Sequence, residues 1–441
     1  MNLKKIYIIL LISIMSGVLI SHNLIPKDVD GIIMSEEGSS RATAYVESNK
    51  ILSNKETKFV TYLENGYDNK FRVMLAEIKK NRIQKNVCVG YSLTNHGGAS
   101  IKFDKTGRIY IVYGGHTSGL KIRYSKKPFD ISDLSKEIKI TKKGTGLTYP
   151  SFEIDDYNNM HLICRKMDLN EDLSPSKPSL NYFKIDISNG LKILSDKELI
   201  SFPEYKYGNF TSSIAIKDNI ISIIYRIYLK DNKEELKKTS YGYIKSVDFG
   251  KNFLNYRNKR VQLPIDFNSN SNLEISEKFL CYISNISYTS SGEIKFILTE
   301  LNKKSENSYL ISIDNKMYKK ERLNNIYDLV HERKINVYVA ISIDRDDNIF
   351  LAFSTLPNTK DESWDSPNNR ISYFKISKNN VDLIYNNIKS TEGMSWLPNI
   401  EQNRNHFSNR YKDIPMLIFS EGETTNDLYR KVNSKVISID F

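Results

Sequence analysis

Six side chains of the types that transfer protons or bind anions recur at matching places along the sequence, namely His96, His116, Tyr149, Arg165, Tyr207 and Arg226. These types suit the abstraction of a proton next to a carboxylate, such as the C5 proton of a uronic acid. Removal of that proton builds negative charge on the carboxylate, which then needs positive or hydrogen-bonding partners. Arg165, His96 and His116 can supply them, and one such donor is typically worth about 3 kcal/mol in the transition state.

Tyr149 is the expected base. A phenol is a poor base at its usual pKa of about 10, but a nearby arginine favours the phenolate. General acid–base catalysis of this kind contributes roughly 10²–10⁴-fold to the rate. The departing O4 then takes a proton from the same tyrosine or from a histidine, while Tyr207 and Arg226 are expected to bind the substrate. No carboxylate pair stands at the corresponding positions, which argues against ordinary glycoside hydrolysis.

Each of these residues also has a purely structural explanation. His96 and His116 lie beside glycine pairs and can cap turns. Tyr149 precedes a proline and can be a packing aromatic. Arg165 and Arg226 end apolar stretches, where a solvated charge is ordinary, but their repetition at equivalent places favours anion binding.

A predicted β-hairpin places the two histidines at one edge of a sheet. Residues 101–104 alternate apolar and polar side chains, residues 105–107 form a turn, and residues 109–113 return as the second strand. Because antiparallel strands bring the two ends of the segment together, His96 and His116 are expected side by side.

The hairpin pattern recurs along the chain, which predicts a ring of β-sheet blades. Clear copies span residues 101–113, 152–164, 214–225, 286–298 and 341–353, and weaker copies pair 58–63 with 71–76 and 415–419 with 428–431. Seven units give an all-β fold, a seven-bladed β-propeller over residues 57–441. Two short strands cannot fold alone, and closure of the ring buries their faces. Residues 41–47 are a candidate for a strand that completes the last blade.

Equivalent hairpin ends of a propeller open onto the same face, so the six candidate residues are expected to converge near one mouth. The segment 246–253 supports this architecture, because it matches the Asp-box pattern of a turn between outer strands. Asp248 is expected to accept hydrogen bonds from nearby backbone amides, and Gly250 to take a positive φ.

Charge and composition restrict the partners. The chain has 441 residues and a formal net charge of +12 at pH 7. Its lysines are scattered through turns, but a positive field still concentrates an anionic partner. No aromatic–basic motif supports nucleic acid as that partner, and an acidic polysaccharide fits as well or better. No cofactor or metal is expected, because no Cys/His spacing resembles a zinc site.

The N-terminus predicts export. Residues 1–22 have a basic start and an apolar run from 6 to 20, which is typical of a signal peptide or an N-terminal membrane anchor. The apolar run is short for a bilayer span, which needs about 20 residues. Residues 23–56 form a polar spacer that is a candidate source of a closing strand. The protein is therefore expected to be a monomer that is secreted or anchored at the cell surface, with no other membrane contact.

Several runs of residues resemble a known family. They are residues 95–96, 115–116, 120–131, 149–152 and the Asp box at 246. They resemble the BNR-repeat propeller proteins that include the ulvan lyases, over about residues 57–440. The resemblance implies seven blades and cleavage of ulvan, a sulfated uronate polysaccharide, by β-elimination. It also implies a site of two histidines, a tyrosine, an arginine and a further tyrosine, matched in order by His96, His116, Tyr149, Arg165 and Tyr207. Gly97 departs from the asparagine that is common in the family.

The leading prediction is therefore a polysaccharide lyase that acts on a uronate-containing acidic glycan. A non-catalytic glycan-binding propeller is one alternative, and the departure at Gly97 favours it slightly. A sialidase-like hydrolase is another, suggested by the Asp box. That chemistry needs an arginine cluster, a tyrosine beside a glutamate, and an aspartate. Arg165 and Arg226 supply part of the cluster, but the sequence offers no convincing third arginine or acid.

Overall fold

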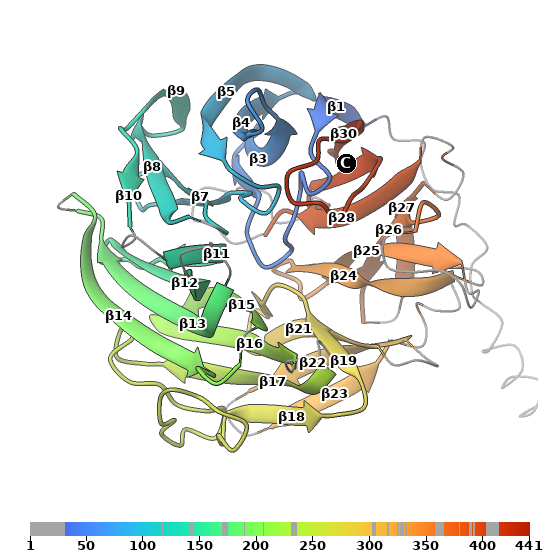
Figure 1. Ribbon diagram of the computed structural model, residues 1–441. Helices are drawn as coiled ribbons and strands as arrows, with labels where there is room; N and C mark the ends of the chain where they lie inside the picture. The colour runs from blue at the N-terminus through green and yellow to red at the C-terminus, as the bar shows by residue number, and fades with distance from the viewer. Residues whose placement is uncertain are drawn as a thin grey trace, which may run out of the picture.

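The computed structural model describes residues 31–441 except 117, 141–144, 170–174, 189, 206, 231–235, 302–305, 315–316, 324–325, 327–329, 331–332, 358–365, 379, 388–389, 391–392 and 403–413. Strands β1 to β30 form sheets arranged as a ring (Figure 1). Within the described residues, no helix is long and apolar enough to cross a bilayer. The predicted signal or anchor, residues 1–22, lies outside the described part.

Five blades are separate sheets of four or five strands. The first contains β6 (Ser100–Phe103), β7 (Ile109–Gly114), β8 (Leu120–Lys127), β9 (Asp130–Leu134) and β10 (Ile138–Lys139). The second contains β11 (Thr145–Ile154), β12 (Asn159–Leu169), β13 (Pro175–Asp186) and β14 (Lys192–Ser201). The third contains β15 (Tyr207–Lys217), β16 (Ile220–Lys230), β17 (Leu236–Ser246) and β18 (Asn272–Ser276). The fourth contains β19 (Leu280–Ile283), β20 (Ser287–Tyr288), β21 (Ile294–Leu301), β22 (Glu306–Ile313) and β23 (Tyr318–Arg322). The fifth contains β24 (Arg333–Ile343), β25 (Ile349–Pro357), β26 (Arg370–Ile376) and β27 (Val381–Asn386).

The remaining strands form one eight-stranded sheet that closes the ring. They are β1 (Ile32–Gly38), β2 (Ile51–Asn54), β3 (Thr57–Asn65), β4 (Phe71–Lys79), β5 (Arg82–Ser92), β28 (Met394–Ile400), β29 (Leu417–Gly422) and β30 (Ser434–Ile439). The propeller is therefore confirmed, but the count of seven blades is wrong. The first and last predicted units are continuous because β1 pairs with both β30 and β3, through Ile32↔Ser438 and Gly38↔Glu64.

The predicted hairpins are present as antiparallel pairs. The five clear copies are β6–β7, β11–β12, β15–β16, β20–β21 and β24–β25, and the first weak copy is β3–β4. The last weak copy is wrong in its second strand, because β29 pairs with β30 and not with residues 428–431. Apolar side chains of neighbouring blades interlock between the sheets, as where Leu63 of β3 joins Ile101 and Ile111 of β6–β7 in one buried cluster.

The Asp-box turn follows the expected chemistry. The Asp248 carboxylate accepts the backbone N–H of Asn252 at 2.9 Å, and Gly250 has φ 83°. The Ser246 hydroxyl accepts the Gly250 N–H at 2.8 Å and lies 2.8 Å from the Asp248 carboxylate. The motif is structural, since its polar atoms bond to one another across the turn.

Residues 39–50 between β1 and β2, here termed the axial segment, form no strand, so the strand predicted at 41–47 is wrong. The segment is buried throughout and reaches into the middle of the ring (Figure 1). Its residues bond to three sheets. Thr43 donates to Leu397 O at 2.7 Å, Ser48 donates to Pro150 O at 2.5 Å, and Asn49 O accepts the Ile101 N–H at 3.0 Å. These hydrogen bonds replace the strand ladder that the segment lacks.

Candidate active site

A pocket of about 250 Å³ lies between the axial segment and the blades, and all the blade residues that line it except His96 lie within strands, away from the hairpin turns. Its lining combines arginine, histidine and tyrosine with a single carboxylate. The lining residues are Arg41, Tyr45, Glu47, His96, Tyr149, Asn209, Thr211, Arg226, Tyr228, Tyr282, Ile283 and Tyr338. Three of the six predicted residues, His96, Tyr149 and Arg226, therefore line one pocket.

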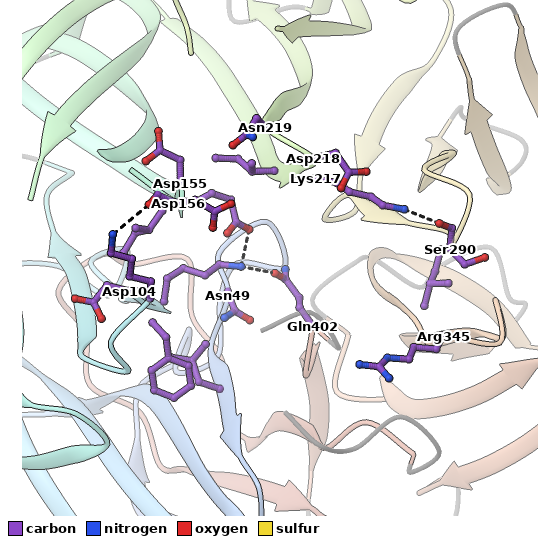
Figure 2. A pocket seen from close by; sticks show the side chains of 18 of the residues that line it. Asn49, Asp104, Asp155, Asp156, Lys217, Asp218, Asn219, Ser290, Arg345 and Gln402 are labelled. Atoms are coloured by element: carbon purple, nitrogen blue, oxygen red, sulfur yellow. Dashed lines mark hydrogen bonds and ion pairs between the residues drawn. The ribbon is translucent and has the colours of Figure 1, made fainter. Parts of the chain in front are cut away.

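A larger pocket, of about 570 Å³, lies among the hairpin turns (Figure 2). Four of its acidic side chains, those of Asp104, Glu153, Asp155 and Asp344, already have partners. Asp155 accepts the backbone N–H of Tyr157 and Asn159, at 2.9 and 2.7 Å, and Lys102 bonds to Glu153 at 2.6 Å and Gln402 at 2.9 Å. These contacts close the turns and join blades, so the smaller pocket is the candidate active site.

His96 lies in the connection between β5 and β6. Its Nδ1 is 3.1 Å from the Tyr45 hydroxyl and 3.2 Å from the Tyr149 hydroxyl. Burial, together with Arg41, His116 and Arg165, lowers the pKa of His96 well below its usual value. The imidazole is thus neutral at neutral pH and can donate or accept one hydrogen bond at each nitrogen.

His116 follows β7 and packs beside His96. The two rings lie 4.7 Å apart, and the His116 backbone N–H donates to Leu147 O at 2.8 Å. A Cβ at the preceding residue, Gly115, would lie 1.7 Å from Leu147 O, so only glycine allows this close approach. Burial, Arg165 and Arg41 lower the pKa of His116 to about 3. Its buried Nδ1 has no hydrogen-bond partner in the described structure.

Tyr149 and Arg165 form a stacked pair. The Arg165 guanidinium carbon lies 4.7 Å from the centre of the Tyr149 ring, and the Arg165 residue is 2% exposed. Both residues lie within strands, not beyond the strand ends as predicted, because β11 and β12 continue to Thr145 and Leu169. The register shifts between Thr148 and Ser151, and Tyr149 has φ 58°. Such a bulge redirects a side chain out of the regular alternation of the strand, here into the pocket.

Arg226 lies in the middle of β16, opposite Thr211 of β15. Its guanidinium carbon is 4.2 Å from the centre of the Tyr282 ring and 5.3 Å from that of Tyr228. The backbone of Tyr207 begins β15, but its side chain lies outside the described part of the structure. The pocket therefore contains the predicted arginine, while the place of the second predicted tyrosine stays a prediction.

The axial segment adds three residues that the sequence did not reveal: Arg41, Tyr45 and Glu47. Burial raises the pKa of Tyr45 well above its usual value, although Arg41 opposes this, so its phenol stays protonated. Burial also raises the pKa of Glu47 to about 7, against the opposing influence of Arg226 and Lys50. The segment shows no alternation of apolar and polar residues, because it is buried in the middle of the ring and does not follow the register of a strand.

The axial segment supplies groups that a sialidase-like hydrolase would need and that the sequence did not reveal. Arg41 is a third arginine beside Arg165 and Arg226, and Glu47 is an acid in the same pocket. However, the Tyr149 hydroxyl lies against His96, and no aspartate is among the described lining residues. A single carboxylate also does not supply the acid–base pair of ordinary glycoside hydrolysis. Within the described residues, no group of three or more His, Cys, Asp or Glu side chains is placed to hold a metal ion.

The fold and the pocket define an all-β propeller with paired histidines, tyrosines and arginines at one mouth. The chain belongs to the family of BNR repeat-containing proteins, whose model matches residues 58–326. No curated protein matches the sequence.

Solved structures share the fold. One is an ulvan lyase of polysaccharide lyase family PL25, described both alone and bound to a GlcA–Rha3S repeat. It has 12% identity, a TM-score of 0.67, and coverage of 93% of this chain and 96% of that one. The polysaccharide lyase Uly1 has 13% identity, a TM-score of 0.57, and coverage of 93% of this chain and 99% of that one. At these identities the likeness establishes the fold of nearly the whole chain.

Proposed function

We propose that the protein is a secreted or surface-anchored polysaccharide lyase that cleaves a uronate-containing acidic glycan by β-elimination. The observation that carries the proposal is a chain of contacts that joins His116 to His96, His96 to Tyr149 and Tyr149 to Arg165. His96 and Tyr149 line the pocket, and His116 and Arg165 pack directly behind them. The fold shared with two polysaccharide lyases supports it. The expected location rests on the sequence of residues 1–22.

The reaction needs charge stabilisation first. Arg165, with neutral His96 and His116 as hydrogen-bond donors, would hold the uronate carboxylate as negative charge builds on it. Arg41 and Arg226 add positive charge around the same pocket. Donors fixed before the reaction stabilise the developing charge without reorganising, and the packing of the histidine and arginine side chains fixes them here.

Tyr149 would act as base and then as acid. Its phenolate, favoured by the adjacent Arg165, takes the C5 proton, and the electron pair of that bond forms the C4–C5 double bond. The C4–O4 bond breaks, and the phenol just formed donates its proton to O4. The tyrosine returns to its starting state, so the step consumes no water and no co-reactant. Tyr45, 3.1 Å from the same His96 nitrogen, would hold that imidazole in place.

The test is the incubation of the purified chain with ulvan, glycosaminoglycans and pectic acids. Ultraviolet absorbance follows the unsaturated uronate, and mass spectrometry identifies the product. A lyase gives an unsaturated end without the added water of hydrolysis. Saturable, salt-sensitive binding without any product would instead show a glycan-binding propeller, and a water-containing product would show a hydrolase. Either result would refute the proposal.

A further inference from the structure

A second set of polar groups lines the pocket, and of these only Arg226 has a role in the mechanism above. Glu47 comes from the axial segment, Asn209 from β15 and Arg226 from β16. Arg226 lies over the rings of Tyr228 and Tyr282, which also line the pocket. The blade that supplies Asn209 and Arg226 adjoins the blade that supplies Tyr149.

Glu47 and Arg226 are buried and Asn209 is half-buried, and each has one polar atom without a hydrogen-bond partner, although Glu47 also contacts the Thr211 hydroxyl. Glu47 is 7% exposed and Arg226 is 4% exposed. No described residue hydrogen-bonds to Glu47 Oε2, Asn209 Oδ1 or Arg226 Nε. Buried polar atoms in folded proteins nearly always have a partner, so these three atoms indicate a place that a polar ligand or ordered water fills.

The chemistry of the open atoms restricts that ligand. Glu47 Oε2 and Asn209 Oδ1 are acceptors, and they need O–H or N–H donors. Sugar hydroxyls meet this need and can also accept from Arg226. A sulfate ester has only acceptor oxygens, so it would leave both acceptors unpaired and would be repelled by an ionised Glu47.

The size of the pocket points the same way. Its volume of about 250 Å³ is below the roughly 300–1,000 Å³ of sites for drug-sized ligands. Little room remains for a bulky substituent beside a sugar ring. The positive charges of Arg41 and Arg226 would attract a sulfate, and Glu47 is the carboxylate of the lining that opposes this attraction.

We propose that Glu47 and Asn209 bind the hydroxyl groups of an unsulfated sugar next to the cleaved uronate, so that the substrate is a uronate polysaccharide without sulfate at that position. This inference rests on the proposed function and narrows its substrate class. It separates this chain from the ulvan lyase bound to GlcA–Rha3S, in which the second sugar carries sulfate.

The test compares ulvan with chemically desulfated ulvan. Binding is measured by calorimetry on the Tyr149→Phe protein, so that the polymer is not cleaved. The desulfated polymer is expected to bind on the order of 10- to 100-fold more tightly, the range for leaving a buried polar group unpaired. In the Tyr149→Phe background, Glu47→Gln should reduce the ratio of the two affinities, because it should improve the binding of the sulfated polymer. Asn209→Ala should weaken binding of the desulfated polymer.

Glu153→Gln is the matched control. Glu153 is also a largely buried glutamate, but it lies among the hairpin turns and pairs with Lys102 at 2.6 Å. Its replacement should leave the ratio of the two affinities unchanged.

The preference for desulfated ulvan over ulvan should also increase as the pH rises from about 6 to about 8. Glu47 ionises near 7, and Lys50, whose pKa burial lowers to about 7, loses its charge over the same range. Arg226 and Tyr338 also face Glu47, and burial raises the pKa of Tyr338 above this range.

The two proposals fail separately. Binding of ulvan as tightly as its desulfated form, an unchanged ratio in Glu47→Gln, or no binding of either polymer would overturn the inference. Absence of unsaturated product from the parent protein, with the binding preference intact, would overturn the lyase and leave only the preference of Glu47 and Asn209 for an unsulfated sugar.

Discussion

Replacing Tyr149 with phenylalanine should separate the chemistry from the fold. The change removes one hydroxyl and leaves the ring, which packs 4.7 Å from the Arg165 guanidinium carbon and 4.7 Å from the Tyr45 ring. If the phenol is both base and acid, turnover should fall by roughly 10²–10⁴-fold. The cost in stability should be only about 0.5–1.5 kcal/mol, the net worth of one hydrogen bond, since His96 Nδ1 keeps Tyr45 at 3.1 Å.

The chain offers a matched control at Tyr182. Its hydroxyl lies 2.6 Å from His161 Nδ1, and His161 Nε2 lies 3.0 Å from Asp155 Oδ2. This is the same tyrosine–histidine contact, but both side chains are fully buried within a blade. Tyr182→Phe should therefore cost at least as much stability as Tyr149→Phe, because it leaves a buried imidazole nitrogen unpaired, and it should retain the activity.

The assay pairs the initial rate of unsaturated-uronate formation with urea denaturation of each variant. A Tyr149→Phe protein that keeps more than about a tenth of the parent turnover would refute the role of the phenol, because the loss would fall outside the range for a positioned acid–base group. Equal losses of activity in Tyr149→Phe and Tyr182→Phe would show that the loss comes from altered packing and not from the missing phenol of Tyr149.

Three further changes test neighbouring parts of the site. Arg165→Lys should lower kcat by roughly 10²–10³-fold, because an ammonium cannot replace a stacked planar guanidinium; an unchanged kcat would remove Arg165 from the site. His116→Asn should flatten the pH dependence of the free energy of unfolding. The pKa of His116 is about 3 in the folded protein and about 6.5 in the unfolded chain, so the protein loses stability as the pH falls through this range. Urea denaturation near the two ends of this pH range checks the change. An unaltered slope of the free energy of unfolding against pH would contradict it. Gly97→Ala should destabilise the protein by about 1–3 kcal/mol, because the new Cβ would lie 1.8 Å from Ser92 Oγ; a melting temperature equal to that of the parent would show that the loop adjusts.

The sequence predicted the hairpins well and the strand limits less well. The apolar residues on either side of a polar turn identify β6–β7, because both strands are buried between blades, as Ile101 and Ile111 are. The same criterion stops β11–β12 too early, since a bulge at Tyr149 interrupts the alternation and pairing resumes beyond it at Thr148↔Arg165. The separation of the first and last blades was wrong because a pattern within strands does not reveal that β1 bonds to strands on both sides.

The proximity of His96, Tyr149 and Arg226 followed from the equivalence of hairpin ends, a geometric rule that needs no side-chain detail. The axial segment followed no such rule. Its residues are held by bonds to blades far away in sequence, such as Thr43 to Leu397 and Ser48 to Pro150. Long-range contacts of this kind leave no periodic trace, so Arg41, Tyr45 and Glu47 could not be found from spacing.

The position of the axial segment also ties the pocket to closure of the ring. Strand β1 pairs with β30 near the C-terminus, and the axial segment begins directly after β1 ends at Gly38. The Ser434 hydroxyl of β30 donates to Gly38 O at 2.9 Å, at the point where the chain turns inward. The pairing of β1 with β30 therefore helps to fix the point from which Arg41, Tyr45 and Glu47 enter the pocket. The histidine and tyrosine from the blades would otherwise face an open axis filled with water, where the low pKa values of His96 and His116, which depend first on burial, would not persist. Closure of the ring is thus a condition for the electrostatics of the site as well as for the fold.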